Sequence, residues 1–95
     1  MRRLYVVTYD IASPKRWRHI FKIMKGFGQH IQLSVFRCDL TDAERVLMEA
    51  ALQDEIEADE DQVLIVDLGP SDGRRHHVRA IGRPTSADRR GAKIL

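Results

Sequence analysis

The chain has 95 residues, of which 43% are apolar and 32% are charged, and its formal net charge is +2. This composition is typical of one folded domain and excludes a disordered chain. No uninterrupted apolar run exceeds four residues, so we expect neither a transmembrane helix nor a secretion signal. The single cysteine excludes an internal disulfide and a multi-thiolate zinc site. We therefore expect a cytoplasmic protein that does not associate with membranes.

The charges are distributed unevenly along the chain. Residues 1–37 contain eight basic residues and one acidic residue, and residues 73–95 contain seven and one. Residues 38–72 contain one Arg and twelve acidic residues. Basic surfaces of this kind suit the phosphate backbone of nucleic acids. The alternative is that the acidic segment neutralises the basic segments, within the fold or across a dimer.

The first third of the chain predicts a strand followed by a helix. Residues 4–9 are rich in β-branched and aromatic side chains and predict a strand that ends at Asp10. Ser13 and Pro14 are typical of a helix start, and the Gly-Phe-Gly sequence at 26–28 of a helix end. The apolar stripe of this helix consists of Trp17, Ile20, Phe21 and Met24.

From residue 30 to residue 40, apolar and polar side chains alternate with a period of two. This stretch fits one long strand, or two short strands with a tight bend near Phe36. Gln32, Ser34 and Phe36 are expected to share one exposed face. Phe36 could there stack on a base or contact a second copy of the chain. Cys38 is expected to be a small buried apolar residue.

A second helix and a further strand follow. Residues 41–44 are typical of a helix start, and the expected apolar stripe of this helix consists of Val46, Leu47, Ala50 and Ala51. Residues 63–66 predict a strand. The basic tail, residues 69–95, contains strand-like pieces at 77–81 and 92–95.

This order of elements predicts a single α+β domain over residues 1–95. The expected fold is a ferredoxin-like βαββαβ sandwich, in which two helices cover one face of an antiparallel sheet. Residues 1–68 are expected to form the core. Residues 69–95 are expected to form a basic tail with a short extra carboxyl-terminal strand.

Asp10 is the candidate for chemistry because it directly follows a hydrophobic strand. A carboxylate in this place suits a hard divalent cation such as Mg²⁺, which takes one or two protein carboxylates and keeps several waters. Water polarised by such an ion can attack a phosphodiester. A two-fold dimer could bring a second Asp10 to the first. The alternative is that Asp10 caps the turn that follows it.

The first predicted helix has a basic face. Its basic side chains have no acidic neighbours within the helix, which favours contact with phosphate over a merely solvated face. These residues are Lys15, Arg16, Arg18, Lys22 and Lys25. The four histidines do not have the spacing of a metal site.

Three motifs, in this order, resemble the small CRISPR-associated endonuclease of the spacer-acquisition machinery. They are YVVTYDI at 5–11, KGFG at 25–28 and QLSVFRC at 32–38. The resemblance covers residues 1–66 and is looser in the tail. It implies a ferredoxin-like fold and a homodimer in which the last strand of each chain joins the sheet of the other.

The resemblance also implies a function. Members of the family are described as metal-dependent nucleases of single-stranded RNA or double-stranded DNA, and as the central DNA-binding dimer beside a larger integrase subunit. Asp10 matches the metal-binding aspartate, so one Mg²⁺ or Mn²⁺ ion is expected between the Asp10 side chains of two subunits. The other expected site residues are Lys15, Arg16, Arg18, Lys22 and Arg37 for nucleic acid, and Tyr9, Ser34 and Phe36 as support of the interface or active site. His30 departs from the pattern, because many relatives have Arg there.

The sequence leaves three functions open. One is a metal-dependent endonuclease, and another is a structural DNA-binding scaffold for the integrase in which Asp10 takes no part in cleavage. A ribonuclease toxin of the same fold is the third, and the motif set favours the first two over it.

Overall fold

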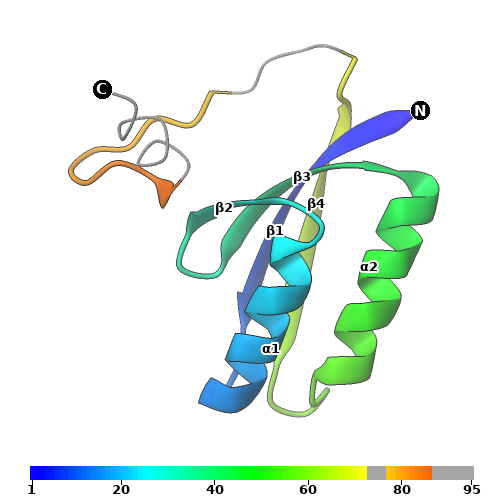
Figure 1. Cartoon of the computed structure of the whole chain (residues 1–95), viewed down its shortest axis with the longest axis vertical. Coiled ribbons are helices and arrows are strands. Elements are labelled where there is room, and N and C mark those ends of the chain that lie inside the picture. Colours follow the sequence, from blue (N-terminus) through cyan, green and yellow to red (C-terminus); the bar gives the residue numbers. More distant parts are fainter. Residues whose placement is uncertain (73–76, 87–95) are drawn as a thin grey trace.

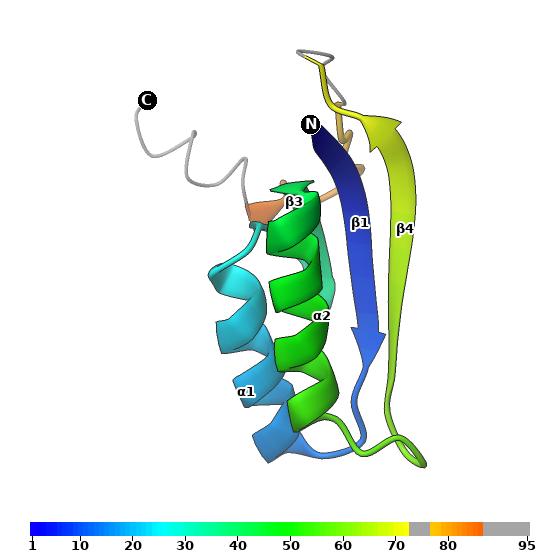
Figure 2. The ribbon, with the colours of Figure 1, turned by 90° about the vertical axis from the view of Figure 1, so that its right-hand side faces the viewer.

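The computed structural model describes residues 1–72 and 77–86. Along the chain follow β1 (Arg2–Asp10), α1 (Pro14–Lys25), β2 (Gln29–Gln32), β3 (Val35–Thr41), α2 (Asp42–Glu55) and β4 (Gln62–Pro70). The strands form one antiparallel sheet in the order β2-β3-β1-β4. Both helices cover the same face of this sheet (Figure 1, Figure 2). The α+β sandwich predicted from the sequence is confirmed.

Both helices begin where their capping residues predict. The Ser13 hydroxyl accepts a hydrogen bond from the Arg16 amide at 3.3 Å, ahead of Pro14 at the first turn of α1. At the start of α2, the Thr41 amide donates to the Glu44 carboxylate at 2.8 Å, and the Glu44 amide donates to the Thr41 hydroxyl at 3.2 Å. These side chains satisfy amides that have no partner within the helix.

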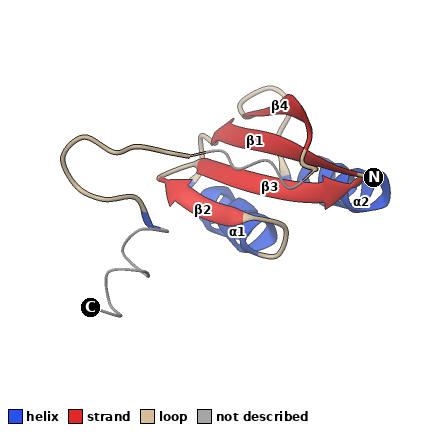
Figure 3. Ribbon diagram, turned by 90° about the horizontal axis from the view of Figure 1, so that it is seen from above, coloured by secondary structure: helices blue, strands red, loops and turns tan. Residues whose placement is uncertain are grey.

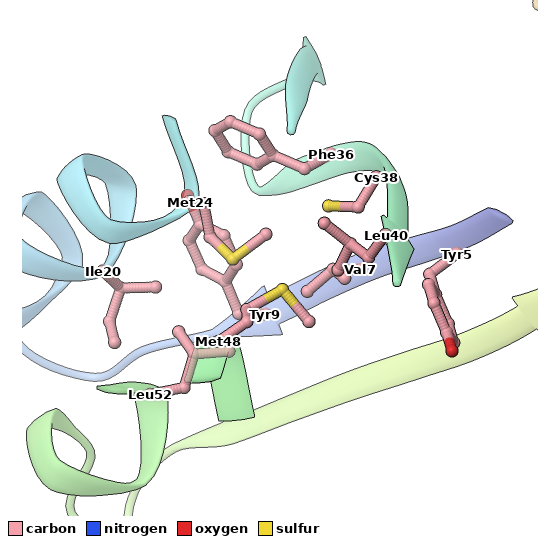
Figure 4. Close-up of a cluster of buried hydrophobic side chains, with 10 residues drawn as sticks. All are labelled: Tyr5, Val7, Tyr9, Ile20, Met24, Phe36, Cys38, Leu40, Met48 and Leu52. Atoms are coloured by element: carbon pink, nitrogen blue, oxygen red, sulfur yellow. The ribbon is translucent and has the colours of Figure 1, made fainter. Parts of the chain in front are cut away.

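The core lies between the sheet and the two helices (Figure 4). It contains Ile20 and Met24 of α1, as the sequence predicts, and Cys38, whose thiol pKa burial raises to about 11. The remaining core side chains shown in Figure 4 are Tyr5, Val7, Tyr9, Phe36, Leu40, Met48 and Leu52.

The predicted apolar stripe of α2 is wrong. Val46 and Leu47 are exposed, and Met48 and Leu52 face the core instead. Each residue turns a helix by about 100°, so Val46 and Leu47 lie on different sides of the helix, away from the buried pair. Spacing alone did not identify the buried pair, because apolar side chains surround most of this helix.

The stretch from 30 to 40 forms two strands with the bend at Leu33 and Ser34, and Leu33 has a φ of 36°. This bend shifts the alternation of side chains by one position. As a result Phe36 lies on the same side as Ile31, facing the helices, and is 0% exposed. The expectation that Phe36 is an exposed aromatic on a shared face with Gln32 is therefore wrong.

The tail is described over residues 77–86. Residues 77–81 form no strand in this segment, so the strand predicted there is wrong. The piece predicted at 92–95 lies outside the described residues, and the division into a core and a tail stays a prediction. None of the helices in the described ranges is both long and apolar enough to cross a membrane.

Candidate active site

Asp10 is the last residue of β1 and is exposed. Side chains alternate along a strand, so Tyr9 points toward the helices while Thr8 and Asp10 point to the other face of the sheet. We call that face, which bears no helix, the outer face (Figure 3). Asp10 thus stands at the corner of the outer face where β1 ends.

Gln62 lies directly opposite Asp10 in the antiparallel pairing of β1 and β4. Directly opposed residues of an antiparallel pair project to the same face, with Cβ atoms about 5 Å apart. Gln62 is also exposed, so a carboxylate and a carboxamide stand side by side at this corner. Gln62 could not be identified from the sequence, because only the strand register reveals its neighbour.

Along β4 and the adjoining part of β1 the outer face is apolar beyond this corner, whereas Arg37 of β3, which lies opposite Val6, projects from the same face. Three side chains of β4 project from it, with Leu64 51% exposed, Val66 47% and Leu68 40%. Val6 and Thr8 of β1 lie beside them and are half-buried. Large apolar side chains gathered on an exposed sheet face are typical of a surface that contacts another protein.

On the other side of the same strand end, Asp61 is fully enclosed, with a side chain that is 0% exposed. Its carboxylate accepts hydrogen bonds from the amides of Ala12 at 2.9 Å and Glu57 at 2.8 Å. It also accepts from Arg16, whose Nε lies 2.8 Å and Nη2 3.1 Å away. The guanidinium is the main cause that holds the pKa of Asp61 well below its usual range, and the two amides add to it.

Arg16 is therefore held by contacts within the chain. Its side chain is only 22% exposed, and its Nη2 also donates to Glu60 at 3.0 Å. The bond to Asp61 is the main cause that raises the pKa of the guanidinium. Both acidic partners precede β4, far from Arg16 in the sequence, so spacing within the helix gave no sign of them. Contact between Arg16 and nucleic acid stays a prediction.

Tyr9, Ser34 and Phe36, predicted as supporting residues, meet behind Asp10 on the helix side of the sheet. The Tyr9 amide donates to the Ser34 carbonyl at 3.1 Å, and Trp17 Nε1 donates to the Ser34 hydroxyl at 2.8 Å. The Tyr9 ring lies 6.3 Å from the rings of both Trp17 and Phe36. Burial, which disfavours the charged phenolate, raises the pKa of Tyr9 to about 12. These contacts fix the strand end that carries Asp10.

His30, the position that departs from the family pattern, belongs to the same aromatic cluster. Its ring lies 5.0 Å from the rings of Phe21 and Phe36, and its Nε2 lies 2.9 Å from the Leu33 carbonyl oxygen. His30 thus packs against α1 and ties the bend between β2 and β3.

Four of the predicted basic residues lie together on the side of α1 that points away from the sheet. These exposed residues, Lys15, Arg18, Lys22 and Lys25, form what we call the α1 basic stripe. The stripe and Asp10 are on opposite sides of the sheet, because Asp10 projects from the outer face and the stripe lies on the far side of α1, although Lys15 follows Asp10 closely in the chain. Arg37 lies elsewhere, paired with Val6 in the ladder and bonded to Gln29.

A single chain supplies few donors for a metal ion. In the part of the chain that the structure describes, no group of three or more His, Cys, Asp or Glu side chains could hold one. Asp10 and Gln62 provide the hard oxygen donors that Mg²⁺ prefers, and Mg²⁺ needs only one or two carboxylates because waters complete its shell. The donor set therefore fits Mg²⁺ or Mn²⁺ when two copies contribute to one site.

A family model described as CRISPR associated protein Cas2 matches residues 1–75. The chain belongs to the Cas2 family. It is 46% identical over 91 residues to the CRISPR-associated endoribonuclease Cas2 1 of Rhodospirillum rubrum, across 96% of this chain and 89% of that protein. It is 44% identical over 95 residues to the CRISPR-associated endoribonuclease Cas2 of Geobacter sulfurreducens, which covers 100% of both chains.

A solved structure of another Cas2 protein has the same fold as this chain. The crystal structure of Streptococcus pyogenes Cas2 is similar with a TM-score of 0.70 at 36% identity, over 83% of this chain and 99% of that chain. The resemblance found in the sequence motifs is thereby confirmed, and so is the fold of this Cas2 family member.

Proposed function

We propose that this Cas2 family member is a metal-dependent endonuclease whose active site forms between two copies of the chain. The observation that carries the proposal is the place of Asp10, at the corner of an exposed apolar sheet face. The relatives from Rhodospirillum and Geobacter are named endoribonucleases, which makes single-stranded RNA the first substrate to test and duplex DNA the second.

The outer face supports a homodimer. A chain of this size buries a modest share of its surface alone, so pairing Leu64, Val66 and Leu68 with a second copy adds hydrophobic stabilisation. A two-fold contact uses the same patch on both chains. Because Asp10 projects from that face, pairing of the outer faces directs both Asp10 side chains toward the interface.

In this arrangement the two Asp10 carboxylates hold one Mg²⁺ or Mn²⁺ ion. When bound there, such an ion polarises a phosphodiester and lowers the pKa of water. Two carboxylates brought together without a cation repel each other, which favours a cation or a proton between them. Gln62 beside each Asp10 supplies an amide that can orient a phosphate oxygen or a water by hydrogen bonding.

A second function is favoured by the place of the α1 basic stripe. Since it lies on the side of the molecule opposite the outer face, a dimer presents one stripe on each of its outer layers. Lys and Arg on such a surface bind the phosphate backbone without reading sequence. The dimer can thus hold DNA for the CRISPR integrase subunit away from Asp10, and this support of spacer integration does not depend on cleavage.

Cleavage of labelled single-stranded RNA and duplex DNA, with Mg²⁺, Mn²⁺ or EDTA, tests the proposal. Asp10→Asn should abolish cleavage and keep the dimer mass and the circular dichroism spectrum of the wild type. Asp59→Asn is the matched control, because Asp59 is an exposed carboxylate before β4 that has no assigned role. Cleavage that survives in Asp10→Asn, or that EDTA leaves unchanged, would contradict the proposal.

A further inference from the structure

We propose that Asp61 is a positioning residue for Asp10, an inference that rests on the proposed function of Asp10. Asp61 is the one buried polar or charged residue among those that the structure describes. An ionised carboxylate is costly to bury unless its oxygens are fully hydrogen-bonded. Asp61 is buried next to the strand ends that form the candidate site, so we expect the effect that offsets this cost to lie there.

The two oxygens of Asp61 are used in the same way. Oδ1 accepts from the Ala12 amide at 2.9 Å and from Arg16 Nη2 at 3.1 Å. Oδ2 accepts from the Glu57 amide at 2.8 Å and from Arg16 Nε at 2.8 Å. One carboxylate thus joins three separate segments, which are the loop after β1, the first turn of α1 and the loop after α2. We call this set the Asp61 clamp.

The Asp61 clamp holds both chain segments that form the candidate site. Ala12 follows Asp10 by two residues, and Asp61 directly precedes Gln62, the partner of Asp10 in the ladder. The clamp lies on the helix side of the sheet, while Asp10 and Gln62 project from the outer face. It therefore fixes the backbone on which both side chains stand without touching an ion or a substrate.

This placement has a measurable consequence for metal binding. A shared ion needs each Asp10 at a defined position, since Mg²⁺ demands near-ideal geometry. Partners that hydrogen-bond the ligands of a metal site typically change its affinity by about 10- to 100-fold when they are lost, and the Asp61 clamp acts one step further back, on the backbone that carries Asp10. A purely structural clamp, in contrast, would change the stability of the fold and leave the metal affinity of the folded protein unchanged.

The test measures Mn²⁺ affinity by electron paramagnetic resonance, on dimers that circular dichroism shows to be folded at the working temperature. Asp61→Asn keeps the size of the side chain but replaces one acceptor oxygen with a donor amide. Asp67→Asn is the matched control, because Asp67 also accepts from one arginine, Arg3 at 3.1 Å, and from one backbone amide, at the far end of β4. Amide hydrogen exchange at Ala12 reports the order of the loop independently of any metal.

We expect Asp61→Asn to weaken Mn²⁺ binding about tenfold and to speed exchange at Ala12. Asp67→Asn should bind Mn²⁺ as the wild type does. If Asp61→Asn does not fold, Arg16→Lys tests the positioning role instead. Lys keeps the positive charge but cannot make both hydrogen bonds that Arg16 donates to Asp61. Weaker Mn²⁺ binding in that variant supports the positioning role.

Two results would overturn the positioning role of Asp61, and only the second would also overturn the proposed metal site at Asp10. If the folded Asp61→Asn or Arg16→Lys dimer binds Mn²⁺ like the wild type while Asp10→Asn loses binding, the positioning role is wrong and the proposed function stands. If Asp10→Asn itself binds Mn²⁺ like the wild type, the proposed metal site is wrong, and the positioning role is wrong with it.

Discussion

Asp10 and Gln62 lie opposite each other at the corner of the sheet where β1 ends and β4 begins. The strand register alone pairs a metal-binding type of side chain with a hydrogen-bonding one. The Asp61 clamp on the reverse side of the sheet holds both strands at this point. The candidate site is thus a property of how two distant segments pair.

Gln62→Ala should lower the rate of RNA cleavage by about three- to tenfold, less than Asp10→Asn does, because an amide can be partly replaced by water. Steady-state kinetics with Mg²⁺ measures the effect. Gln53→Ala, on the exposed side of α2, is the control and should cleave RNA at the rate of the wild type. Equal rates for Gln62→Ala and the wild type would remove Gln62 from the site.

Arg18→Glu should weaken binding of duplex DNA and reduce the steepness of its salt dependence. The slope of log K against log salt is negative, and each lost phosphate contact reduces its magnitude by about 0.9. Binding titrations between low and physiological salt measure the slope. Arg45→Glu changes the net charge equally, but Arg45 pairs with Glu49 at 2.7 Å on α2. If both variants change the slope equally, the α1 basic stripe is not the DNA surface.

Phe36→Leu should reduce stability and leave nucleic-acid affinity unchanged, because Phe36 is enclosed in the core. Truncation to Ala should cost about 3–5 kcal/mol, and the milder change to Leu, which leaves a smaller cavity, should cost less than that. Urea unfolding measures the stability, and a binding titration with RNA measures the affinity. If a folded Phe36→Leu protein binds RNA clearly more weakly than the wild type, Phe36 contacts a base after all.

The Asp61 clamp predicts how stability depends on pH. Because the pKa of Asp61 is lower in the folded state than its ordinary value of 3.8, the carboxylate stabilises the fold fully above that value. This contribution declines as the pH falls below it, toward the folded-state pKa. Urea unfolding between about pH 7 and pH 3 measures the difference in free energy of unfolding between the wild type and Asp61→Asn. This difference should be constant at first and should become smaller below about pH 4. If the difference in free energy of unfolding stays the same down to about pH 3, the pKa of Asp61 is not lowered in the folded protein.

Local signals in the sequence predicted local structure well. Ser13 and Thr41 cap their helices as expected, because a cap depends on residues within one turn. The order of strands and helices, read from periodicity, was enough to predict the sandwich. Asp10 was found because it follows the strand directly.

What the sequence did not reveal depends on contacts between distant residues. The bend at Leu33 turns Phe36 into the core, and only the pairing of β2 with β3 places it there. Likewise Arg16 looked free because its partners, Glu60 and Asp61, come from the loop before β4. The register of β4 then decides that Gln62 stands beside Asp10.

Mixing subunits tests whether two Asp10 side chains from two copies form one site. Wild-type and Asp10→Asn chains are mixed in varying ratios at constant total concentration, allowed to exchange, and assayed for RNA cleavage with Mg²⁺. If both carboxylates are required, activity falls with the square of the wild-type fraction, because mixed dimers are inactive. A linear decline, in dimers whose exchange is verified by mass, would show that each chain acts alone and that no site is shared between two copies.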